Sequence, residues 1–147
     1  MVLILNGPNL NRLGKREPHI YGHDTLDDIA DRLEDRAREL GLTIDMRQSN
    51  HEGHLIDWLH EAQARCAKAV ILNAGAFTHT SIAVHDAIKG IRTPVIEVHL
   101  SNPEEREPFR HVSLLEDIAA VAVRGAGAAG YERAVALIAE LRAEAST

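Results

Sequence analysis

Short apolar runs alternate with longer stretches of helical periodicity along this chain, and that alternation restricts its fold more than any other feature. The apolar runs, each expected to form a strand, span residues 2–5, 42–46, 69–72, 94–98 and 118–123. Apolar residues recur every three or four positions between them, which predicts helices over 25–40, 55–66, 81–89 and 130–145. Such alternation predicts an α/β fold, a doubly wound five-stranded parallel sheet with helices on both faces.

Residues at the ends of the expected helices support this assignment. Thr25 begins the pattern Thr-Leu-Asp-Asp, which is typical of a first helical turn, and Gly41 follows as a helix stop. Ser81 can cap the third helix. The second helix is expected to carry one apolar face, made of Leu55, Ile56, Leu59, Ala62 and Cys66.

Length and composition exclude several classes of protein. With 147 residues and no change in composition along the chain, residues 1–147 are expected to form a single domain. The only cysteine, Cys66, excludes an internal disulfide and fits a reducing, cytoplasmic setting. A net charge of −6 and few aromatic residues argue against nucleic-acid binding. We expect no membrane partner, because no apolar run has the length of a span and no signal peptide is recognisable.

The connection from Gly7 to Asp24 is about three times as long as most strand-to-helix connections in α/β domains. It holds basic side chains that include Arg12, Lys15, Arg16 and His19, two prolines and Tyr21, one of only two tyrosines in the chain. Its apolar residues can pack, which argues against plain disorder. A long, structureless connection with this chemistry predicts a lid over an active site.

Polar groups follow three of the expected strands. The first strand leads into Asn6-Gly-Pro-Asn9, and the third leads into Asn73-Ala-Gly-Ala-Phe-Thr-His-Thr-Ser81. The fourth carries Glu97 and leads into His99-Leu-Ser-Asn102. Ligands bind beyond the carboxyl ends of the strands in such sheets. One of these segments alone would be an ordinary polar loop, but three that converge predict a pocket.

Two pairs of residues suggest proton transfer. Glu97 and His99 lie two apart on a strand, so their side chains point the same way, and the carboxylate can orient the imidazole. The spacing alone fits a surface ion pair equally well. Arg16 would lower the pKa of the Tyr21 phenol and make it a base, whereas the alternative for Tyr21 is a packing anchor. Backbone N–H groups near Asn73 suit a carboxylate or an oxyanion.

Two further patterns are not expected to form sites. Gly125-Ala-Gly-Ala-Ala-Gly130 matches a dinucleotide-binding pattern, but no further strand or ribose-binding acid follows it. Its glycines are better explained by a turn and close packing. His79 and His85 lack the helical spacing and the companion cysteine of a zinc site, so neither metal nor cofactor is expected.

Several of these segments, in the same order, resemble the motifs of the type II 3-dehydroquinases (3-dehydroquinate dehydratases) of the shikimate pathway. The resemblance covers essentially the whole chain. The matching segments are Asn6-Gly-Pro-Asn-Leu-Asn-Arg-Leu-Gly14, Arg16-Glu-Pro, Tyr21-Gly22, Gln48-Ser-Asn-His-Glu-Gly53, Asn73 to Ser81, Asp86-Ala, Glu97-Val-His-Leu-Ser-Asn102, Arg106-Glu and Phe109-Arg-His-Val-Ser113. The resemblance implies a flavodoxin-like fold and a single catalytic domain, with a lid at about residues 7–24.

It also implies the dehydration of 3-dehydroquinate to 3-dehydroshikimate, a hydro-lyase reaction by anti elimination through an enolate. Tyr21 would be the base, and Arg16 would lower its pKa. Asn9 would stabilise the enolate oxygen. His99, oriented by Glu97, would protonate the departing hydroxyl.

The implied substrate-binding residues are Asn73, Gly75, Ala76, His79, Asp86, Leu100, Ser101 and Arg110. Asn73 and the N–H groups of Leu100 and Ser101 would hold the substrate carboxylate, while the charged and imidazole side chains of the set would bind ring hydroxyls. Asp86 would come from a neighbouring subunit, because the family assembles as a homododecamer, a tetramer of trimers. Phe77 and His85 depart from the family pattern at positions that flank the matched groups.

Two other functions compete with the lyase. A flavodoxin-like receiver or binding module would need acidic residues where Asn6 and Asn73 stand, or aromatic residues for a flavin. An inactive homologue acting as a scaffold is disfavoured because every matched catalytic position is filled. An imine mechanism, as in the unrelated type I enzymes, is not expected. None of Lys15, Lys68 and Lys89 lies at a strand end with the pattern of a pocket.

Overall fold

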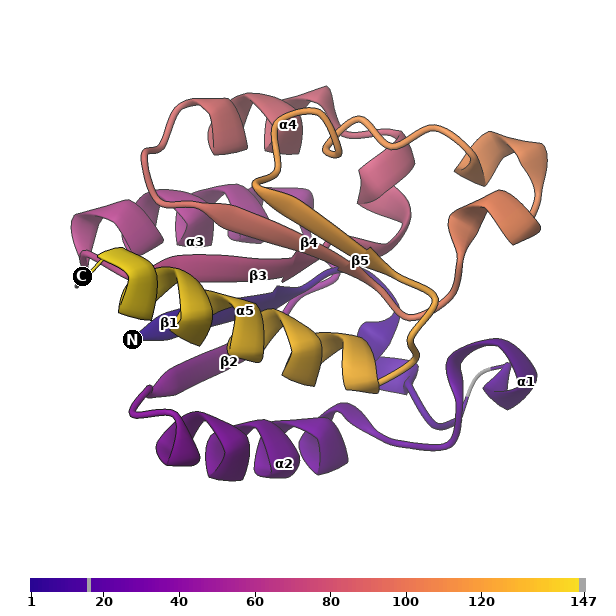
Figure 1. Ribbon diagram of the computed structural model, residues 1–147. Coiled ribbons are helices and arrows are strands. Elements are labelled where there is room, and N and C mark those ends of the chain that lie inside the picture. The colour runs from indigo at the N-terminus through magenta and orange to yellow at the C-terminus, as the bar shows by residue number, and fades with distance from the viewer. Residues whose placement is uncertain (16, 146–147) are drawn as a thin grey trace.

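The computed structural model describes residues 1–15 and 17–145, and its centre is one five-stranded sheet (Figure 1). The strands are β1 (Val2–Asn6), β2 (Ile44–Gln48), β3 (Ala69–Asn73), β4 (Val95–His99) and β5 (Val121–Arg124). All neighbouring strands are parallel, in the order β2-β1-β3-β4-β5. The doubly wound architecture expected from the alternation is therefore confirmed.

Helices cover both faces of this sheet. They are α1 (Pro18–Tyr21), α2 (Leu26–Glu39), α3 (Glu52–Ala64), α4 (Ile82–Lys89) and α5 (Ala129–Ala145). In Figure 1, α2 and α5 lie on one face, α3 and α4 lie on the other, and α1 stands apart near the carboxyl ends of the strands. Among the described residues, no helix combines the length and the apolar character that crossing a bilayer requires.

The two cores meet at β1, which explains why residues 2–5 of that strand are all apolar. Val2 and Ile4 pack into the cluster that contains residues of α2 and α5. Leu3 and Leu5 point the other way, into the cluster that contains residues of α3 and α4. All four side chains are fully buried, because alternate residues of a strand face opposite sides of the sheet.

The expected helix ends are present. The Thr25 hydroxyl accepts a hydrogen bond from Asp28 N–H at 3.2 Å, and the Asp28 carboxylate accepts one from Thr25 N–H at 3.1 Å. Gly41 has a φ of 72°, so it ends α2 in the left-handed conformation that glycine adopts without strain. The Ser81 hydroxyl caps α4 by accepting from Val84 N–H at 2.9 Å.

Several of the expected boundaries are wrong. The second strand is Ile44–Gln48 rather than 42–46, and the second helix begins at Glu52 rather than at residue 55. Cys66 does not lie on the apolar face of α3, because that helix ends at Ala64 and Cys66, with a φ of 54°, is exposed. The fifth strand begins at Val121 rather than at residue 118, because pairing with β4 starts only there. Ile118 instead lies in a turn and packs against the α3–α4 core.

The first long connection was expected to be structureless, and that expectation is wrong. It contains a 3-10 helix, η1 (Leu10–Arg12), and the helix α1. Leu10 and Leu13 are buried in the core beside α2 and α5. A Cβ placed on Gly14 would meet the carbonyl oxygen of His23 at 2.7 Å, so the two ends of segment 15–22 nearly touch. This part of the connection is a compact loop that projects from the sheet edge.

Strand register brings the polar residues of the sequence to one edge. Asn6 at the end of β1 lies between Gln48 of β2 and Asn73 of β3. His99 is the last residue of β4 and is paired with Arg124 of β5. The segments that leave β1, β3 and β4 therefore start side by side, as the site prediction requires.

Candidate active site

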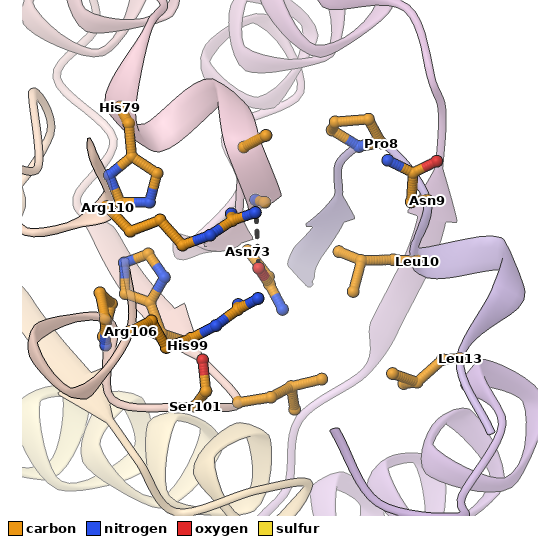
Figure 2. A pocket seen from close by; sticks show the side chains of 14 residues that line it. Pro8, Asn9, Leu10, Leu13, Asn73, His79, His99, Ser101, Arg106 and Arg110 are labelled. Atoms are coloured by element: carbon orange, nitrogen blue, oxygen red, sulfur yellow. Dashed lines mark hydrogen bonds between the residues drawn. The ribbon is translucent and has the colours of Figure 1, made fainter. Parts of the chain in front are cut away.

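A pocket lies at this edge, between the segments that follow β1, β3 and β4 (Figure 2). The described residues that line it are Pro8, Asn9, Leu10, Leu13, Asn73, Gly75, Ala76, His79, His99, Leu100, Ser101, Pro103, Arg106 and Arg110. In Figure 2, the imidazole and guanidinium groups face Pro8, Asn9, Leu10 and Leu13 across the opening. The pocket thus has a basic wall from the later segments and a largely apolar wall from the first connection.

The floor of the pocket depends on a close approach of two strand exits. Gly7 N–H donates to the carbonyl of Asn73 at 2.8 Å. A Cβ on Gly7 would lie 2.4 Å from the carbonyl oxygen of Ala74, which no side chain tolerates. Gly75 has a φ of 59° and sits against Pro8. Glycine at positions 7 and 75 therefore lets the two backbones meet beneath the ligand space.

Glu97 and His99 form a buried pair behind the basic wall. The His99 Nε2–H group donates to Glu97 Oε1, and the two side chains are almost completely buried. The Ser113 hydroxyl donates to the same oxygen at 2.8 Å. With Nε2 directed at the carboxylate, Nδ1 is the ring nitrogen that remains for proton transfer.

The charge of Glu97 is set by its partners. Burial disfavours the carboxylate, but the hydrogen bonds from His99 and Ser113 and the nearby Arg124 outweigh burial and hold the pKa of Glu97 below its ordinary value. Glu97 is therefore ionised at neutral pH and faces Nε2 of the His99 ring. This is the electrostatic arrangement that a general acid needs.

His79 lies beside His99 with different chemistry. The two rings stack with centroids 6.4 Å apart. His79 Nδ1–H donates to the carbonyl of Val112 at 2.8 Å. Burial lowers the pKa of His79, and the positive charges of His99 and Arg110 add to that effect against the opposing Val112 hydrogen bond. A neutral His79 presents Nε2 as an acceptor, which suits a ligand hydroxyl.

Two arginines supply the positive charge of the pocket. Arg110 lies on a 3-10 helix, η4 (Pro108–Arg110), where its Nε–H donates to Glu107 at 3.1 Å. Arg106 Nε lies 3.6 Å from the same carboxylate group. Both side chains are mostly buried, so Glu107 fixes two guanidinium groups at the pocket wall. Guanidinium groups fixed in this way can hold anionic or hydroxyl groups of a ligand.

The segment after His99 is held from behind by a glycine turn. Gly125 N–H donates to the carbonyls of His99 and Ser101, each at 3.2 Å, and Gly127 N–H donates to the carbonyl of Leu100 at 3.0 Å. Both glycines have positive φ angles. The Gly-rich pattern therefore makes a turn that supports the pocket, as expected from the sequence.

Asn9 is positioned by its backbone. It has a φ of 68°, and its N–H donates to Asn50 Oδ1 at 2.9 Å. Gln48 Nε2 donates to that same oxygen and to the carbonyl of Gly7, both at 3.1 Å. The Asn9 side chain is thus left exposed at the pocket rim, where Figure 2 shows it.

Known proteins are similar to this chain in sequence and in fold. The family model for dehydroquinase class II matches residues 1–139. The chain belongs to the class II dehydroquinase family. It is 54% identical to 3-dehydroquinate dehydratase 2 of Pseudomonas putida over 144 residues, which cover 98% of this chain and 96% of that one. It is also 54% identical to 3-dehydroquinate dehydratase of Halalkalibacterium halodurans over 139 residues, 95% of each chain.

A solved structure agrees with the sequence relatives. Type II dehydroquinase from Propionibacterium acnes superposes with a TM-score of 0.91 at 44% identity, covering 95% of each chain. The resemblance, the flavodoxin-like fold and the hydro-lyase class expected of the class II dehydroquinase family are therefore confirmed.

The structure brings together most of the residues that the class II dehydroquinase motifs indicated. Those that line the pocket are Asn9, Asn73, Gly75, Ala76, His79, His99, Leu100, Ser101 and Arg110. Glu97 lies directly behind His99. Asp86 does not line the pocket of this chain: its side chain is 72% exposed on α4, where it lies 3.2 Å from His85. Arg16 and the side chain of Tyr21 fall outside what the structure describes.

Sequence reasoning assigned no role to several residues of the site. Arg106 was recognised as part of a motif, but its place in the pocket follows only from the fold of the segment after β4. Ser113 reaches Glu97 from 16 residues away. Leu10 and Leu13 could have been suggested by their apolar character within a polar connection. Within residues 1–15 and 17–145, no group of three or more metal-ligating side chains is placed to hold an ion.

Proposed function

We propose that this chain dehydrates 3-dehydroquinate to 3-dehydroshikimate by anti elimination through an enolate, with Tyr21 as base and His99 as general acid. The observation that carries the proposal is the buried Glu97–His99 pair at the wall of a basic pocket. The substrate is a carboxylate with ring hydroxyls and a ketone, and the pocket offers guanidinium, imidazole, amide and backbone donors. The reaction develops negative charge, which such donors stabilise.

The acid half of the reaction belongs to β4. His99 would donate a proton to the C1 hydroxyl as the C1–O bond breaks, and water would leave. The ionised Glu97 and the Ser113 hydroxyl hold the ring so that Nδ1 is available to deliver that proton. Loss of a general acid of this kind typically slows a reaction by roughly 100-fold to 10,000-fold.

The base half belongs to the first connection. Tyr21 as phenolate would remove the proton α to the ketone, and Arg16 would stabilise that phenolate. Asn9 at the pocket rim would stabilise the enolate oxygen. His19 and Ile20 of α1 border a second hollow together with Leu100, Ser101 and Arg106, which also line the pocket. This neighbourhood supports a role for residues 7–24 as a lid that closes over the substrate.

The remaining contacts would orient the substrate. Asn73 and the N–H groups of Leu100 and Ser101 would hold its carboxylate, close to the backbone of Gly75 and Ala76. The carbonyls of Leu100 and Ser101 accept hydrogen bonds from the glycine turn behind the pocket wall. This arrangement supports the role proposed for the N–H groups of the same segment. A second set of side chains, His79, Arg110 and a neighbouring subunit's Asp86, would bind the ring hydroxyls.

The contact of a neighbouring subunit's Asp86 with the substrate requires an assembly, which we propose to be a homododecamer built as a tetramer of trimers. Ile82 and Asp86 lie four residues apart on α4, so they share one face of that helix. Ile82, Phe109 and Val112 are exposed apolar side chains, each about two-thirds accessible in the single chain. Burial of such side chains against another copy would bring Asp86 to a neighbour's pocket. A cytoplasmic location completes the proposal and fits the free Cys66 thiol.

The deciding experiment adds purified protein to 3-dehydroquinate and follows the ultraviolet absorbance of the conjugated enone product. We expect a rise with the wild-type chain and a loss of kcat by orders of magnitude for Tyr21→Phe, which removes only the phenol oxygen. No rise with the wild-type chain would refute the proposed activity. Near-normal turnover by Tyr21→Phe would refute the assignment of the base alone. Borohydride added with substrate should leave the activity intact, because no lysine forms an imine.

A further inference from the structure

The second described tyrosine, Tyr131, is a fully buried polar side chain on α5 that reaches the floor of the pocket. Its hydroxyl lies between two residues at the carboxyl ends of neighbouring strands, Asn6 of β1 and Asn73 of β3. Neither the fold nor the proposed proton transfers explain why a phenol rather than a phenyl ring stands here. A phenylalanine would fill the same apolar space, so the hydroxyl must be explained by its hydrogen bonds.

These hydrogen bonds form one directed chain. Asn6 Nδ2 donates to the carbonyl of Arg47 at 3.1 Å, which turns Asn6 Oδ1 toward Tyr131. The Tyr131 hydroxyl donates to that oxygen at 2.5 Å. Asn73 Nδ2 then donates to the Tyr131 oxygen at 3.0 Å, and Asn73 Oδ1 accepts from Gly75 N–H at 3.2 Å. The contact between Asn73 and Gly75 is the dashed line in Figure 2.

The chain has only one consistent direction. The Arg47 carbonyl can only accept, so the amide orientation of Asn6 is fixed. Asn6 then offers an acceptor to Tyr131, whose single proton is used, so Tyr131 can only accept from Asn73. Asn73 must place Nδ2 on that side. One Nδ2 hydrogen of Asn73 remains after this contact, and it is available to a ligand in the pocket that Asn73 lines.

The phenol of Tyr131 stays neutral throughout. Its complete burial raises its pKa, against a smaller opposing effect of the Asn73 hydrogen bond. Tyr131 is therefore not a second base, and it keeps the proton that the chain of hydrogen bonds requires at all working pH values.

We propose that Tyr131 is a positioning residue: through its hydroxyl it fixes the Asn73 amide so that an N–H donor, and not a carbonyl oxygen, faces the carboxylate of the substrate. This inference rests on the proposed role of Asn73 in binding that carboxylate. A flipped amide would present an acceptor to an anion and would repel it. Together with the Gly75 N–H group, which donates to Asn73 Oδ1, Tyr131 thus sets the polarity of the site without touching the substrate.

The first test is Tyr131→Phe, which keeps the ring and removes the hydroxyl. A contact to the carboxylate is made in both the ground state and the transition state, so its loss raises KM and leaves kcat nearly unchanged. We expect KM for 3-dehydroquinate to rise about tenfold, as the loss of one hydrogen bond to a charged group predicts. Asn6→Ala should raise KM similarly, because it frees the Tyr131 proton to turn toward Asn73. This second variant decides the matter if Tyr131→Phe does not fold.

A double-mutant cycle separates positioning from general stability. Tyr131→Phe should add no further rise in KM to Asn73→Ala, because both act through one amide. Ile138→Val is the matched control, since it weakens the same helix within the core but touches none of these groups. It should lower the melting temperature by a few degrees and leave KM unchanged.

Three results would overturn the proposal: an unchanged KM in both Tyr131→Phe and Asn6→Ala, additive effects with Asn73→Ala, or a rise in KM for Ile138→Val as large as that for Tyr131→Phe. If the wild-type chain did not convert 3-dehydroquinate, the proposed function would fail before Tyr131 was tested. The two failures are therefore distinguishable.

Discussion

The two walls of the pocket are built very differently. The wall from β4 consists of buried residues whose side chains and backbone are tied from behind, by Ser113 and by the turn at Gly125 and Gly127. Among the described residues of the first connection, Leu10 and Leu13 are the ones buried in the core, and α1 beyond them stands outside the layers of the fold. In the proposed mechanism the acid belongs to the rigid wall and the base to the loosely tied one. Proton delivery and proton removal should therefore respond differently to perturbation.

The largest expected contrast comes from one substitution made on each wall. His99→Ala should lower kcat by roughly 100-fold to 10,000-fold, because it removes the general acid. It should also lower the free energy of unfolding by about 1–3 kcal/mol, because it leaves a buried carboxylate short of a partner. Steady-state kinetics and urea unfolding measure the two effects.

His19→Ala on α1 is the matched control for that comparison. The His19 side chain is exposed, so its removal should change the free energy of unfolding by no more than about 0.5 kcal/mol. A loss of stability equal to that of His99→Ala would mean that the two walls are equally integrated into the fold.

A smaller effect is expected for Ser113→Ala, which weakens the support of the rigid wall. Its hydroxyl donates a hydrogen bond that lowers the pKa of Glu97, so its removal should raise that pKa. The ionised Glu97 stabilises the folded chain above the ordinary carboxyl pKa, and that contribution is lost as the pH falls through the lowered value. In Ser113→Ala both this loss and the acid limb of the pH–rate profile should therefore move to higher pH.

Ser113→Thr retains the hydroxyl and should keep the wild-type pH profile. An acid limb that stays in place in Ser113→Ala would show that Ser113 does not influence the Glu97–His99 pair.

The smallest effect concerns the loosely tied wall. Trypsin should cut the folded chain first after the exposed Lys15, and 3-dehydroshikimate should slow that cut several-fold by closing the lid. The connection after β4 should resist, because Arg106 and Arg110 are only 13% and 19% exposed. Mass spectrometry of the first fragments would identify the site. First cleavage at Arg106 or Arg110 would reverse the proposed contrast between the walls.

The rigid parts of the molecule were also the parts that sequence reasoning predicted best. Alternation of apolar runs and helical periods predicts the sheet because the inner strands β1, β3 and β4 are buried on both faces. Local caps such as Thr25 and Ser81 mark helix ends directly. The boundaries that failed depend on tertiary contacts. Ile118 has the composition of a strand but packs in a turn, and Cys66 follows a helix that had already ended.

The site divides in the same way. Residues that leave strand ends, such as Asn73 and His99, were placed correctly because parallel strands bring their carboxyl ends to one edge. Residues that hydrogen-bond to this part of the site from behind, such as Ser113 and Tyr131, cannot be recognised from the sequence around them. Tyr131 lies 58 residues from Asn73 and 125 residues from Asn6 in the chain, so only the packing of α5 on the sheet reveals the contact.

The near contact between Gly14 and the carbonyl of His23 has a practical consequence for engineering. Because the residues that flank segment 15–22 lie close together, the segment can be exchanged as a unit without moving its two attachment points. Replacement by segments of other lengths should cost little in folding free energy, since doubling a loop adds only about 0.6 kcal/mol of closure entropy. Exchanging segment 15–22 among relatives, with Gly14, His23 and the proposed base Tyr21 retained, would therefore vary the lid and leave the sheet and its acid untouched.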